Sequence, residues 1–256
     1  MANKDSMGRT LTVAFLLCVV CSVVVSGAAV SLRPLQQANK DLDRKRNILL
    51  AAGLYSETET VDTQFAAIET RLVDLDSGRF VESDDPASYD QRKAAKDPSQ
   101  SRSLDDDEDI AKISRRENRA LVYLVQSDGA IDKVILPIHG YGLWSTLYGF
   151  IALERDLNTV AGLGFYDHGE TPGLGGEVDN PRWKAAWPGN LVYSDGDVDL
   201  SLAKGAVDPS SANARHRVDG LSGATLTSRG VSNLVKFWLG ADGFQPFLNN
   251  LKAGDA

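Results

Sequence analysis

The sequence predicts an α+β fold, in which an antiparallel β-sheet with flanking helices follows one N-terminal transmembrane helix. Three observations predict this fold. An uncharged apolar run occupies residues 11–30, four strand-like segments follow one another between residues 119 and 166, and a helical pattern occupies residues 231–239. A series of strands that precedes helices, instead of alternating with them, is typical of an α+β domain with an antiparallel sheet.

The apolar run has the length and composition of a membrane-spanning helix. Residues 11–30 carry no charge, and about half of them are Leu, Val or Phe, which favour insertion into a bilayer. A helix of about 20 residues rises about 30 Å, which matches the bilayer core. We therefore predict a transmembrane helix at residues 11–32 after a tail of residues 1–10. A cleavable signal peptide, with Lys4 and Arg9 as its basic region, is the alternative.

The charged residues exclude one class of partner and bear on the orientation of the chain. The formal net charge is −8, so nucleic acid is not expected to be a partner. More Lys and Arg residues follow the apolar run than precede it. The positive-inside rule, taken alone, therefore predicts that the domain after the helix lies in the cytoplasm.

Cysteine and histidine give no sign of a metal site. Both cysteines, Cys18 and Cys21, lie in the apolar run, so we expect a packing role for them. The three histidines, His139, His168 and His216, are far apart in the sequence. A zinc site needs three or four ligands that converge, so no metal site is predicted.

A membrane-proximal region is predicted at residues 33–118. Residues 41–54 change from charged to apolar and end near a glycine, which indicates a helix that leaves the membrane. Residues 65–81 alternate in places and predict a strand. Residues 82–109 are rich in Ser, Asp, Lys and Pro and have few apolar side chains. This composition predicts a long exposed excursion.

Residues 119–256 are predicted to form the main domain, which begins with four strands. Residues 120–125 and 131–136 are strand-like, and a Ser-Asp-Gly-Ala segment lies between them, which predicts a β-hairpin. Two further strands are expected at residues 148–154 and 159–166. The closing segment is short and polar, with two phenylalanines that we expect to pack on the core.

The helix near the C-terminus is preceded by a segment of small and hydroxyl-bearing residues, 219–228. Its apolar side chains recur at the spacing of one helical face, at Val231, Leu234, Val235, Trp238 and Leu239. Gly240 stands where a glycine that ends a helix belongs. The free N–H groups and the positive end of the dipole at a helix N-terminus favour a phosphate group.

Four hydroxyls lie in this segment: Ser222, Thr225, Thr227 and Ser228. Their chemistry alone does not choose among them. In the simpler interpretation, Ser222 or Thr225 caps the helix by accepting a hydrogen bond from a first-turn amide. In the alternative, one hydroxyl holds a phosphorylated ligand, and Gly220 and Gly223 let the backbone approach it.

Two glycine-rich segments, residues 139–149 and 168–176, suit a planar ligand. Glycine at this density weakens regular structure and often marks a close approach of the backbone to another group. The aromatic residues and leucines between the glycines supply flat apolar walls. The alternative is two tight turns with aromatic side chains in the core. Neither segment continues into a dinucleotide-binding or Walker motif, so NADH binding by this chain is not predicted.

Three motifs in these segments resemble the FMN-binding-domain family of bacterial membrane redox complexes. They are Gly-x-Gly-Leu-Trp at residues 140–144, Glu-Thr-Pro-Gly-Leu-Gly at 170–175 and Asp-Gly-x-Ser-Gly-Ala-Thr at 219–225. The last motif resembles the flavinylation motif of that family. The three occur in the order that the family shows, and the resemblance covers roughly residues 119–240.

The resemblance implies that the chain carries FMN covalently. A phosphoester would join the cofactor to Thr225, and a separate flavin transferase would attach it. The other motif residues at the cofactor would be Ser222, Gly223 and Ala224. The resemblance also implies that Trp144 and Leu174 flank the isoalloxazine ring. Glu170 and Thr171 would bond the polar edge of the ring or the ribityl chain.

The function implied by the resemblance is electron transfer in a membrane complex. The N-terminal helix and the chain length resemble family members that serve in Na⁺-pumping NADH:ubiquinone reductases of the bacterial inner membrane. Other subunits of the complex and the lipid bilayer would be partners, and the flavin domain would be periplasmic, in conflict with the charge count. The chain alone is expected to turn over no NADH and to supply no catalytic residue. Two alternatives are the G subunit of an Rnf-type ferredoxin:NAD complex and a non-redox, signal-anchored binding module.

Overall fold

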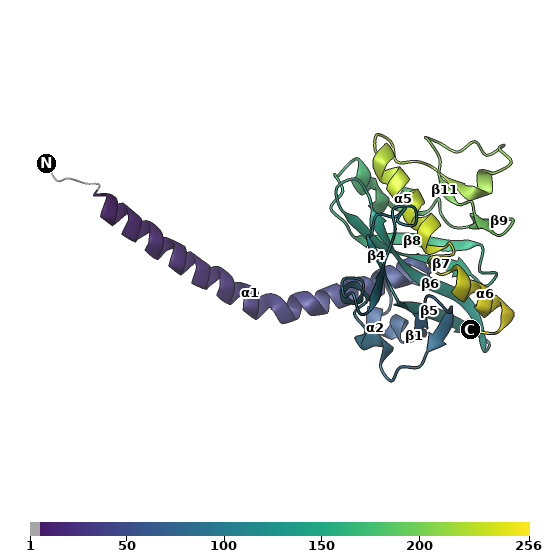
Figure 1. The fold of residues 1–256 in the computed structure, drawn as a ribbon, viewed down its shortest axis with the longest axis horizontal. Helices are drawn as coiled ribbons and strands as arrows, with labels where there is room; N and C mark the ends of the chain where they lie inside the picture. Colours follow the sequence, from purple (N-terminus) through teal and green to yellow (C-terminus); the bar gives the residue numbers. More distant parts are fainter. Residues whose placement is uncertain (1–5) are drawn as a thin grey trace. The chain divides into compact units, whose positions relative to one another are not determined.

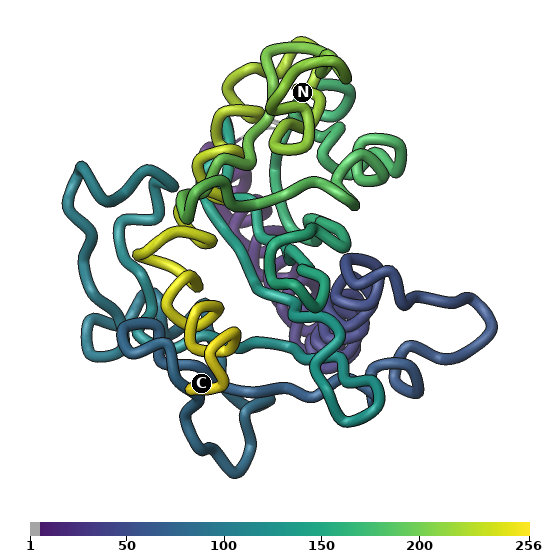
Figure 2. The backbone as a smooth tube through the Cα atoms, turned by 90° about the vertical axis from the view of Figure 1, so that its right-hand side faces the viewer, coloured from purple at the N-terminus to yellow at the C-terminus, as the bar shows by residue number. Residues whose placement is uncertain are grey.

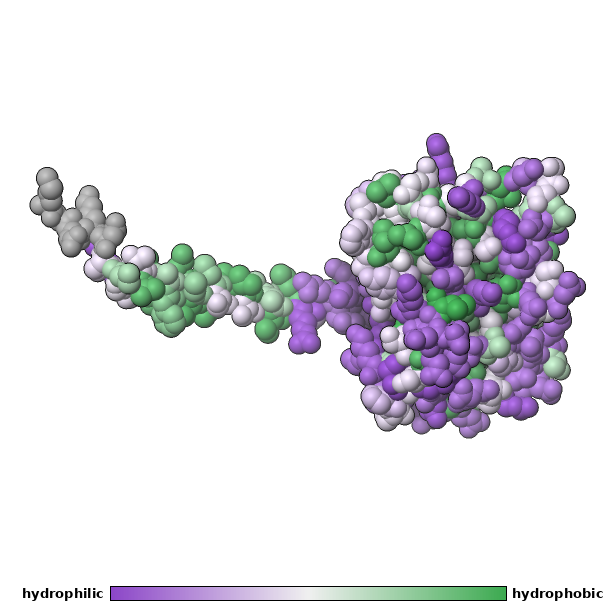
Figure 3. Space-filling model, turned by 45° about the horizontal axis from the view of Figure 1, so that its top comes forward, coloured by the Kyte–Doolittle hydropathy of each residue, from purple (hydrophilic) through white to green (hydrophobic). Residues whose placement is uncertain are grey.

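The first element of the computed structural model, which describes residues 6–256, is the long helix α1 (Met7–Ala51). It contains the whole predicted transmembrane segment, residues 11–32, and ends inside the helix predicted at residues 41–54 (Figure 1). Within residues 6–256, no other helix is long and apolar enough to cross a membrane. The apolar stretch of α1 is exposed and forms a continuous hydrophobic surface (Figure 3). A helix of this kind supports the predicted membrane anchor.

Two compact units make up the described chain, and the predicted tail lies only partly within it. Residues 1–5 of the tail lie outside the described residues, and the first unit extends to Asp43. The second unit, residues 44–256, contains all the strands and both C-terminal helices that the structure describes. All three motifs that resemble the FMN-binding domain belong to this second unit.

The second unit is built on a six-stranded antiparallel sheet in the order β2-β1-β5-β6-β7-β8. Its strands are β1 (Ile68–Asp74), β2 (Arg79–Val81), β5 (Arg119–Ser127), β6 (Ala130–Tyr141), β7 (Thr146–Glu154) and β8 (Val160–Asp167). The antiparallel sheet with its helices confirms the predicted α+β class. Its last four strands are the four that the sequence predicts at the start of the main domain.

Two features of this sheet show how far local sequence fixes it. The hairpin between β5 and β6 turns at Asp128 and Gly129, whose φ angles are 52° and 75°. A left-handed conformation at both central residues is the type I′ turn, which matches the twist of the strands. β1 pairs with β5 along its whole length. The segment predicted as one strand at residues 65–81 is instead a hairpin of β1 and β2. It shares a sheet with the main domain, across the predicted boundary between residues 118 and 119.

The two faces of the sheet carry separate hydrophobic clusters, because successive residues of a strand point to opposite faces. In β5, Val122 belongs to the larger cluster, and Leu121 and Tyr123 belong to the smaller one. The smaller cluster is covered by the end of α1 and by α2 (Val61–Phe65). The larger cluster is covered by the C-terminal helices.

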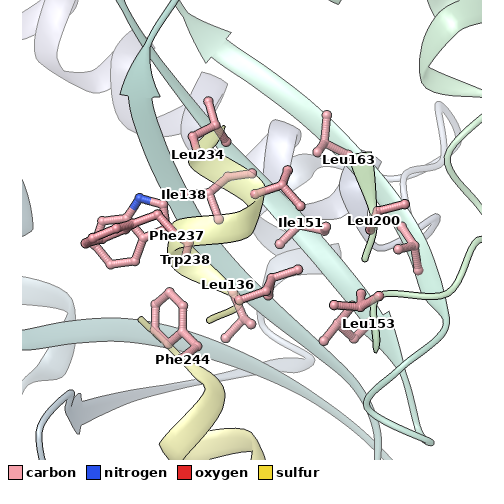
Figure 4. Packing of buried hydrophobic residues seen from close by; sticks show 14 of the residues in the cluster. Leu136, Ile138, Ile151, Leu153, Leu163, Leu200, Leu234, Phe237, Trp238 and Phe244 are labelled. Carbon is pink, nitrogen blue, oxygen red and sulfur yellow. The ribbon is translucent and has the colours of Figure 1, made fainter. Parts of the chain in front are cut away.

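Helix α5 (Thr225–Trp238) lies on the larger cluster, against β6. The apolar side chains predicted to form its inner face are buried: Val231, Leu234, Val235, Trp238 and Leu239. Figure 4 shows Leu234 and Trp238 packed among the side chains of β6 and β7. Each large apolar side chain contributes about 1.5–3 kcal/mol when fully buried. The Trp238 indole also donates to the His139 carbonyl at 2.6 Å, which fixes the helix on the strand.

Helix α6 (Gln245–Ala253) follows α5 and packs on the same cluster (Figure 2). Phe244 and Phe247 are fully buried, as predicted for the closing segment. Gly240 follows the C-cap of α5, but its φ is not left-handed. A Cβ at Gly240 would lie 2.6 Å from the Lys236 carbonyl oxygen. Close packing, and not a positive φ, therefore requires glycine here.

The predicted excursion at residues 82–109 is mostly exposed, but it is tied to the sheet. The short elements between β2 and β5 are η1 (Pro86–Ser88), α3 (Gln91–Ala94), β3 (Ser101–Ser103) and β4 (Arg115–Glu117). Gln91 accepts a hydrogen bond from the Leu121 amide at 3.1 Å. Arg92 forms an ion pair with Asp167 at 2.8 Å. These contacts hold α3 at the strands, which the composition of the segment does not indicate.

The chain between β8 and α5 contains only short elements. They are η2 (Gly175–Asp179), α4 (Pro181–Lys184), β9 (Tyr193–Ser194), β10 (Asp197–Val198), β11 (Ser201–Leu202), η3 (Ala214–His216) and β12 (Arg217–Val218). β11 and β12 pair in parallel. The Trp183 indole donates to the Asp219 carbonyl at 2.9 Å. This connection therefore fixes the backbone immediately before α5.

Candidate functional site

The residues before α5 form a turn that the surrounding chain holds in place. The Gly220 amide donates to the Gly205 carbonyl at 2.9 Å, and a Cβ at Gly220 would clash with the Ala203 carbonyl oxygen. Gly223 has a φ of +71°, in the left-handed region that favours glycine. The backbone of this turn therefore requires both glycines of the Asp-Gly-x-Ser-Gly-Ala-Thr motif.

Two of the four candidate hydroxyls are buried and bonded to the protein. Thr227 is 0% exposed and Ser228 is 7% exposed. The Thr227 hydroxyl donates to Glu170 Oε2 at 2.7 Å. The Ser228 hydroxyl accepts a hydrogen bond from the Leu221 amide at 3.0 Å. These two side chains are parts of the packed interior, and neither offers a free oxygen to a ligand.

The other two hydroxyls, those of Ser222 and Thr225, are exposed. No hydrogen bond joins either hydroxyl to any of the residues 6–256. The N-cap of α5 is Ala224, and no side chain caps the helix. The interpretation that Ser222 or Thr225 caps the helix is therefore wrong. Thr225 is the first residue of α5, so its free hydroxyl lies at the helix N-terminus.

The amides of the first turn of α5 are also free. Ser228 is the first residue whose N–H bonds back to the helix start, to the Ala224 carbonyl at 2.9 Å. Among the described residues, no acceptor meets the N–H groups of residues 225–227. Free donors and the positive end of a 14-residue helix favour a negatively charged group beside Thr225.

Glu170 connects the β6–β7 loop to the first turn of α5. Its carboxyl is buried, with 5% of the residue exposed. Oε1 accepts hydrogen bonds from the amides of Leu143 at 3.0 Å, Trp144 at 2.9 Å and Ser145 at 3.2 Å. Oε2 accepts from the Thr227 hydroxyl. Hydrogen bonds to an ionised acceptor are stronger than neutral ones, so Glu170 locks both segments together.

The same hydrogen bonds determine the charge of Glu170. Burial would raise the pKa of this carboxyl, but the Thr227 hydroxyl and the three loop amides hold the pKa below its ordinary value. Glu170 is therefore ionised at neutral pH. Because both of its oxygens are bonded to the protein, this buried carboxylate holds the loop and the helix together whether or not a ligand is bound.

The glycines predicted to line a ligand also line this carboxylate. A Cβ at Gly142 would lie 2.6 Å from Glu170 Oε1, and a Cβ at Gly175 would lie 2.6 Å from Glu170 Oε2. A Cβ at Gly140, which lies inside β6, would lie 2.6 Å from Leu234 Cβ of α5. Much of the glycine density therefore reflects close packing on Glu170 and on α5, which the sequence pattern attributed to a ligand.

The structure brings the residues predicted to contact the ring to one region, in different settings. Trp144 and Leu174 are exposed, at 66% and 45%. Leu174 lies against the turn before α5, since a Cβ at Gly223 would be 3.1 Å from Leu174 Cδ2. Thr171 is exposed, and its carbonyl accepts from the amides of Leu174 at 3.1 Å and Gly176 at 2.9 Å. Glu170, by contrast, is buried and bonded within the protein.

Some residues of this region were missed or left undecided by sequence reasoning. Leu226, the residue after Thr225, is an apolar residue that is 51% exposed in the first turn of α5. Ser145 accepts a hydrogen bond from the Gly169 amide at 2.6 Å and so joins the two glycine-rich loops. Glu170 is the one acidic residue in the two glycine-rich segments. This isolated charge is the sequence signal that could have indicated its role in holding the loops.

The arrangement suits a phosphorylated ligand with a flat apolar part. The free hydroxyl and amides at the start of α5 suit a phosphate. The exposed side chains of Trp144 and Leu174 suit an apolar ring. Among residues 6–256, no group of three or more His, Cys, Asp or Glu side chains could hold a metal ion.

Comparison with known proteins gives matches over the whole chain. A sequence model of the FMN-binding domain matches residues 142–240. The C subunit of the Na(+)-translocating NADH-quinone reductase of Pseudomonas aeruginosa is 58% identical over 100% of both chains. The protein of the same name from Yersinia pestis is 51% identical over 98% of this chain and 96% of the relative. The crystal structure of Shewanella oneidensis NqrC matches with a TM-score of 0.78 and 39% identity, over 84% of this chain and 99% of that one.

Proposed function

Because the chain belongs to the family of C subunits of Na(+)-translocating NADH-quinone reductases, we propose that it is the membrane-anchored, FMN-carrying electron-transfer subunit of such a complex. The FMN-binding domain at residues 142–240 and the apolar helix α1 support the two parts of this proposal. The relatives compared above are named as C subunits, which favours this branch over the G subunit of an Rnf-type complex. FMN supplies the redox chemistry, and the chain binds, orients and tunes it.

We place the covalent attachment of FMN, a phosphoester, at Thr225 Oγ1. The observation that carries this assignment is the free, exposed hydroxyl of the first residue of α5, beside unbonded amides. Thr227 and Ser228 are buried and bonded, so their oxygens are blocked. Ser222 is exposed but lies before the helix, farther along the chain from the free amides of residues 225–227. With Gly223 and Ala224, Ser222 lines the approach to the phosphate.

A separate flavin transferase that uses FAD would make this bond. The Thr225 oxygen bonds to the phosphorus of the FMN half, the phosphoanhydride bond breaks, AMP leaves, and the hydroxyl proton passes to solvent. The chain gains the mass of FMN less one water. The phosphoester keeps a negative charge, which the dipole and the free amides of α5 stabilise.

The ring of the flavin would lie against the exposed apolar side chains of Trp144 and Leu174. Leu174 lies beside the turn that leads to Thr225. A flavin whose phosphate is attached at the start of α5 can therefore place its ring at Leu174. Thr171 is exposed and can bond a polar edge of the cofactor. Glu170 acts chiefly by holding the Trp144 backbone, and this role needs no direct bond from Glu170 to the flavin.

The proposed setting is the bacterial inner membrane, with α1 as a single span and the flavin domain in the periplasm. Other subunits of the complex, the flavin transferase during maturation, and lipid around α1 are the proposed partners. The excess of Lys and Arg after the apolar run predicts the opposite orientation. A reporter that is active only outside the cytoplasm, fused after Ala256, tests the side. We expect activity, and a silent but expressed fusion would contradict the periplasmic placement.

Intact mass spectrometry tests the proposed function most simply. The full chain is expressed in its host membrane with the transferase and measured after denaturation, beside Thr225→Ala and the matched control Ser222→Ala. We expect the wild type and Ser222→Ala to carry one FMN less water, and Thr225→Ala to carry none. An unmodified wild-type chain, with a transferase shown to be active on another substrate, would favour the noncovalent binding module.

A further inference from the structure

His168 lies two residues before Glu170 and connects it to the next loop. Its Nδ1 accepts a hydrogen bond from the Glu170 amide at 3.2 Å. Its Nε2 lies 2.9 Å from Asp179 Oδ2. The side chain of His168 is 12% exposed, whereas that of Asp179 is 54% exposed. The imidazole therefore holds the backbone of Glu170 from one nitrogen and a carboxylate from the other.

These two contacts are compatible with only one protonation state of the ring. Nδ1 can accept from the Glu170 amide only if it carries no proton, so Nε2 carries the proton and donates it to Asp179. In the imidazolium both nitrogens are donors. Protonation would therefore place an Nδ1–H against the Glu170 N–H, and that hydrogen bond would be lost.

The acidic groups around His168 favour the imidazolium, which cannot accept the hydrogen bond from the Glu170 amide. The hydrogen bond to Asp179 raises the pKa of His168, burial lowers it, and the negative charges of Asp179, Glu170 and Asp167 raise it further. Lys184 lies 3.4 Å from Asp179 Oδ1, and Arg92 lies 2.8 Å from Asp167 Oδ2, so each acid has a cation nearby. Together these groups raise the pKa of His168 above its ordinary value of about 6.5.

The sign of the pH effect follows from this raised pKa. The stabilisation by the imidazolium–Asp179 pair is fully present below the ordinary value of about 6.5 and is lost as the pH rises through the folded-state pKa. The bond from the Glu170 amide to Nδ1 has the opposite dependence, because it exists only for the neutral ring. The Asp179 contact therefore exists in both states and is stronger for the charged ring, whereas the Glu170 contact is lost on protonation.

A shift of the Glu170 backbone would reach both segments of the site. The Glu170 carboxylate holds the amides of Leu143, Trp144 and Ser145, and it holds the Thr227 hydroxyl two residues after Thr225. The neighbouring Gly169 amide is bonded to Ser145. The loop that carries Trp144 and the first turn of α5 are therefore connected to His168 through one residue.

We propose that His168 is a positioning residue whose protonation state sets the arrangement of the flavin-bearing segments through Glu170. The neutral ring holds both the Glu170 amide and Asp179, and the protonated ring keeps Asp179 and releases the amide. The coupling between His168 and Glu170 belongs to the chain itself. Only its effect on bound flavin rests on the proposed function.

The test uses the full-length chain in detergent, with and without attached flavin, labelled with ¹⁵N in His and Glu. Nuclear magnetic resonance follows the His168 ring nitrogens and the Glu170 amide over about pH 5 to 9, a range that brackets an ordinary histidine. Circular dichroism in the visible region follows the flavin of the modified chain. We expect all three signals to change with one midpoint, and the Nε2–H tautomer above it.

Two variants separate this role from a merely structural one. In His168→Asn the Asn oxygen can accept from the amide two residues on, as in an Asx-turn, but it does not titrate. We expect this variant to keep the high-pH flavin spectrum and to lose its pH dependence. The matched control His216→Asn also removes an imidazole, and we expect it to keep the pH dependence of the wild type.

Two results would overturn the proposal. One is a Glu170 amide that does not follow the titration of His168. The other is an unchanged pH dependence of the flavin spectrum in His168→Asn. The flavin-free Thr225→Ala chain should still show the coupling of His168 to the Glu170 amide, so a failure of flavin attachment remains distinguishable from a failure of this coupling.

Discussion

The exposed turn at residues 222–225 and the buried first turn of α5 at residues 227–228 carry the same functional group in opposite surroundings. Each has two hydroxyls within a few residues of the helix start. In the buried pair, Thr227 is bonded to Glu170 and Ser228 to the Leu221 amide. In the exposed pair, neither hydroxyl bonds to any residue of the described chain.

This difference shows that burial, and not residue type, separates the roles of the four hydroxyls. The buried pair fixes the helix start on the loop that Glu170 holds, because unbonded polar atoms would be costly there. The exposed pair stays chemically available on a turn whose backbone is already rigid. A reactive group on a fixed backbone is the arrangement that a covalently carried cofactor requires.

The largest expected effect is the loss of flavin in Thr225→Val. This change removes the exposed hydroxyl and keeps the shape of the side chain, so we expect complete loss of covalent FMN. An exposed side chain without protein hydrogen bonds contributes little, so the free energy of unfolding of the flavin-free chain should change by no more than about 0.5 kcal/mol. In-gel flavin fluorescence and chemical unfolding measure the two quantities. Covalent flavin that is retained in Thr225→Val would contradict the assignment of different roles to the exposed and buried hydroxyl pairs.

The next largest effect is expected for Glu170→Ala. This change leaves three loop amides and the Thr227 hydroxyl without their acceptor. Hydrogen bonds to a charged group contribute about 1.5–3 kcal/mol each and are not additive, so we expect a loss of about 4 kcal/mol in stability. Chemical unfolding of the full chain in detergent measures it. A loss below about 1 kcal/mol would show that Glu170 does not anchor the loop.

A smaller effect is expected for Thr227→Val, the buried counterpart of Thr225→Val. The change removes the donor to Glu170 Oε2 and should cost about 1.5–3 kcal/mol of stability. Attachment of FMN should persist in the chains that fold. Thr225→Val should therefore lose flavin and keep its stability, whereas Thr227→Val should lose stability and keep its flavin. Equal effects of both variants on flavin content would contradict the separation.

The smallest expected effect is a pH dependence of the stability that comes from the buried Glu170 carboxyl. The folded-state pKa of Glu170 is lowered, so its contribution to stability is present above the ordinary value of about 4.3 and is lost as the pH falls through the folded-state pKa. We expect the difference in stability between the wild type and Glu170→Gln to shrink in that acidic window. Unfolding curves measured above and below it test this, and a constant difference would contradict it.

The strands, the membrane helix and the inner face of α5 could be predicted, because period and composition within one segment determine them. The pairing of β1 with β5 could not, since a long excursion separates the two strands. The site shows the same limit. The sequence places Glu170 in a motif, but its partners Leu143 and Thr227 are distant along the chain. Nor can a sequence show which of four neighbouring hydroxyls is exposed.

The most direct measurement is the position of the flavin on the peptide that contains all four hydroxyls. The flavinylated full chain is digested, and fragmentation of the peptide that spans residues 219–228 locates the added mass. We predict the modification at Thr225 and at none of the other three hydroxyls. A modification at Thr227 or Ser228 would contradict the rule that burial blocks the hydroxyl, and one at Ser222 would contradict the role of the helix N-terminus.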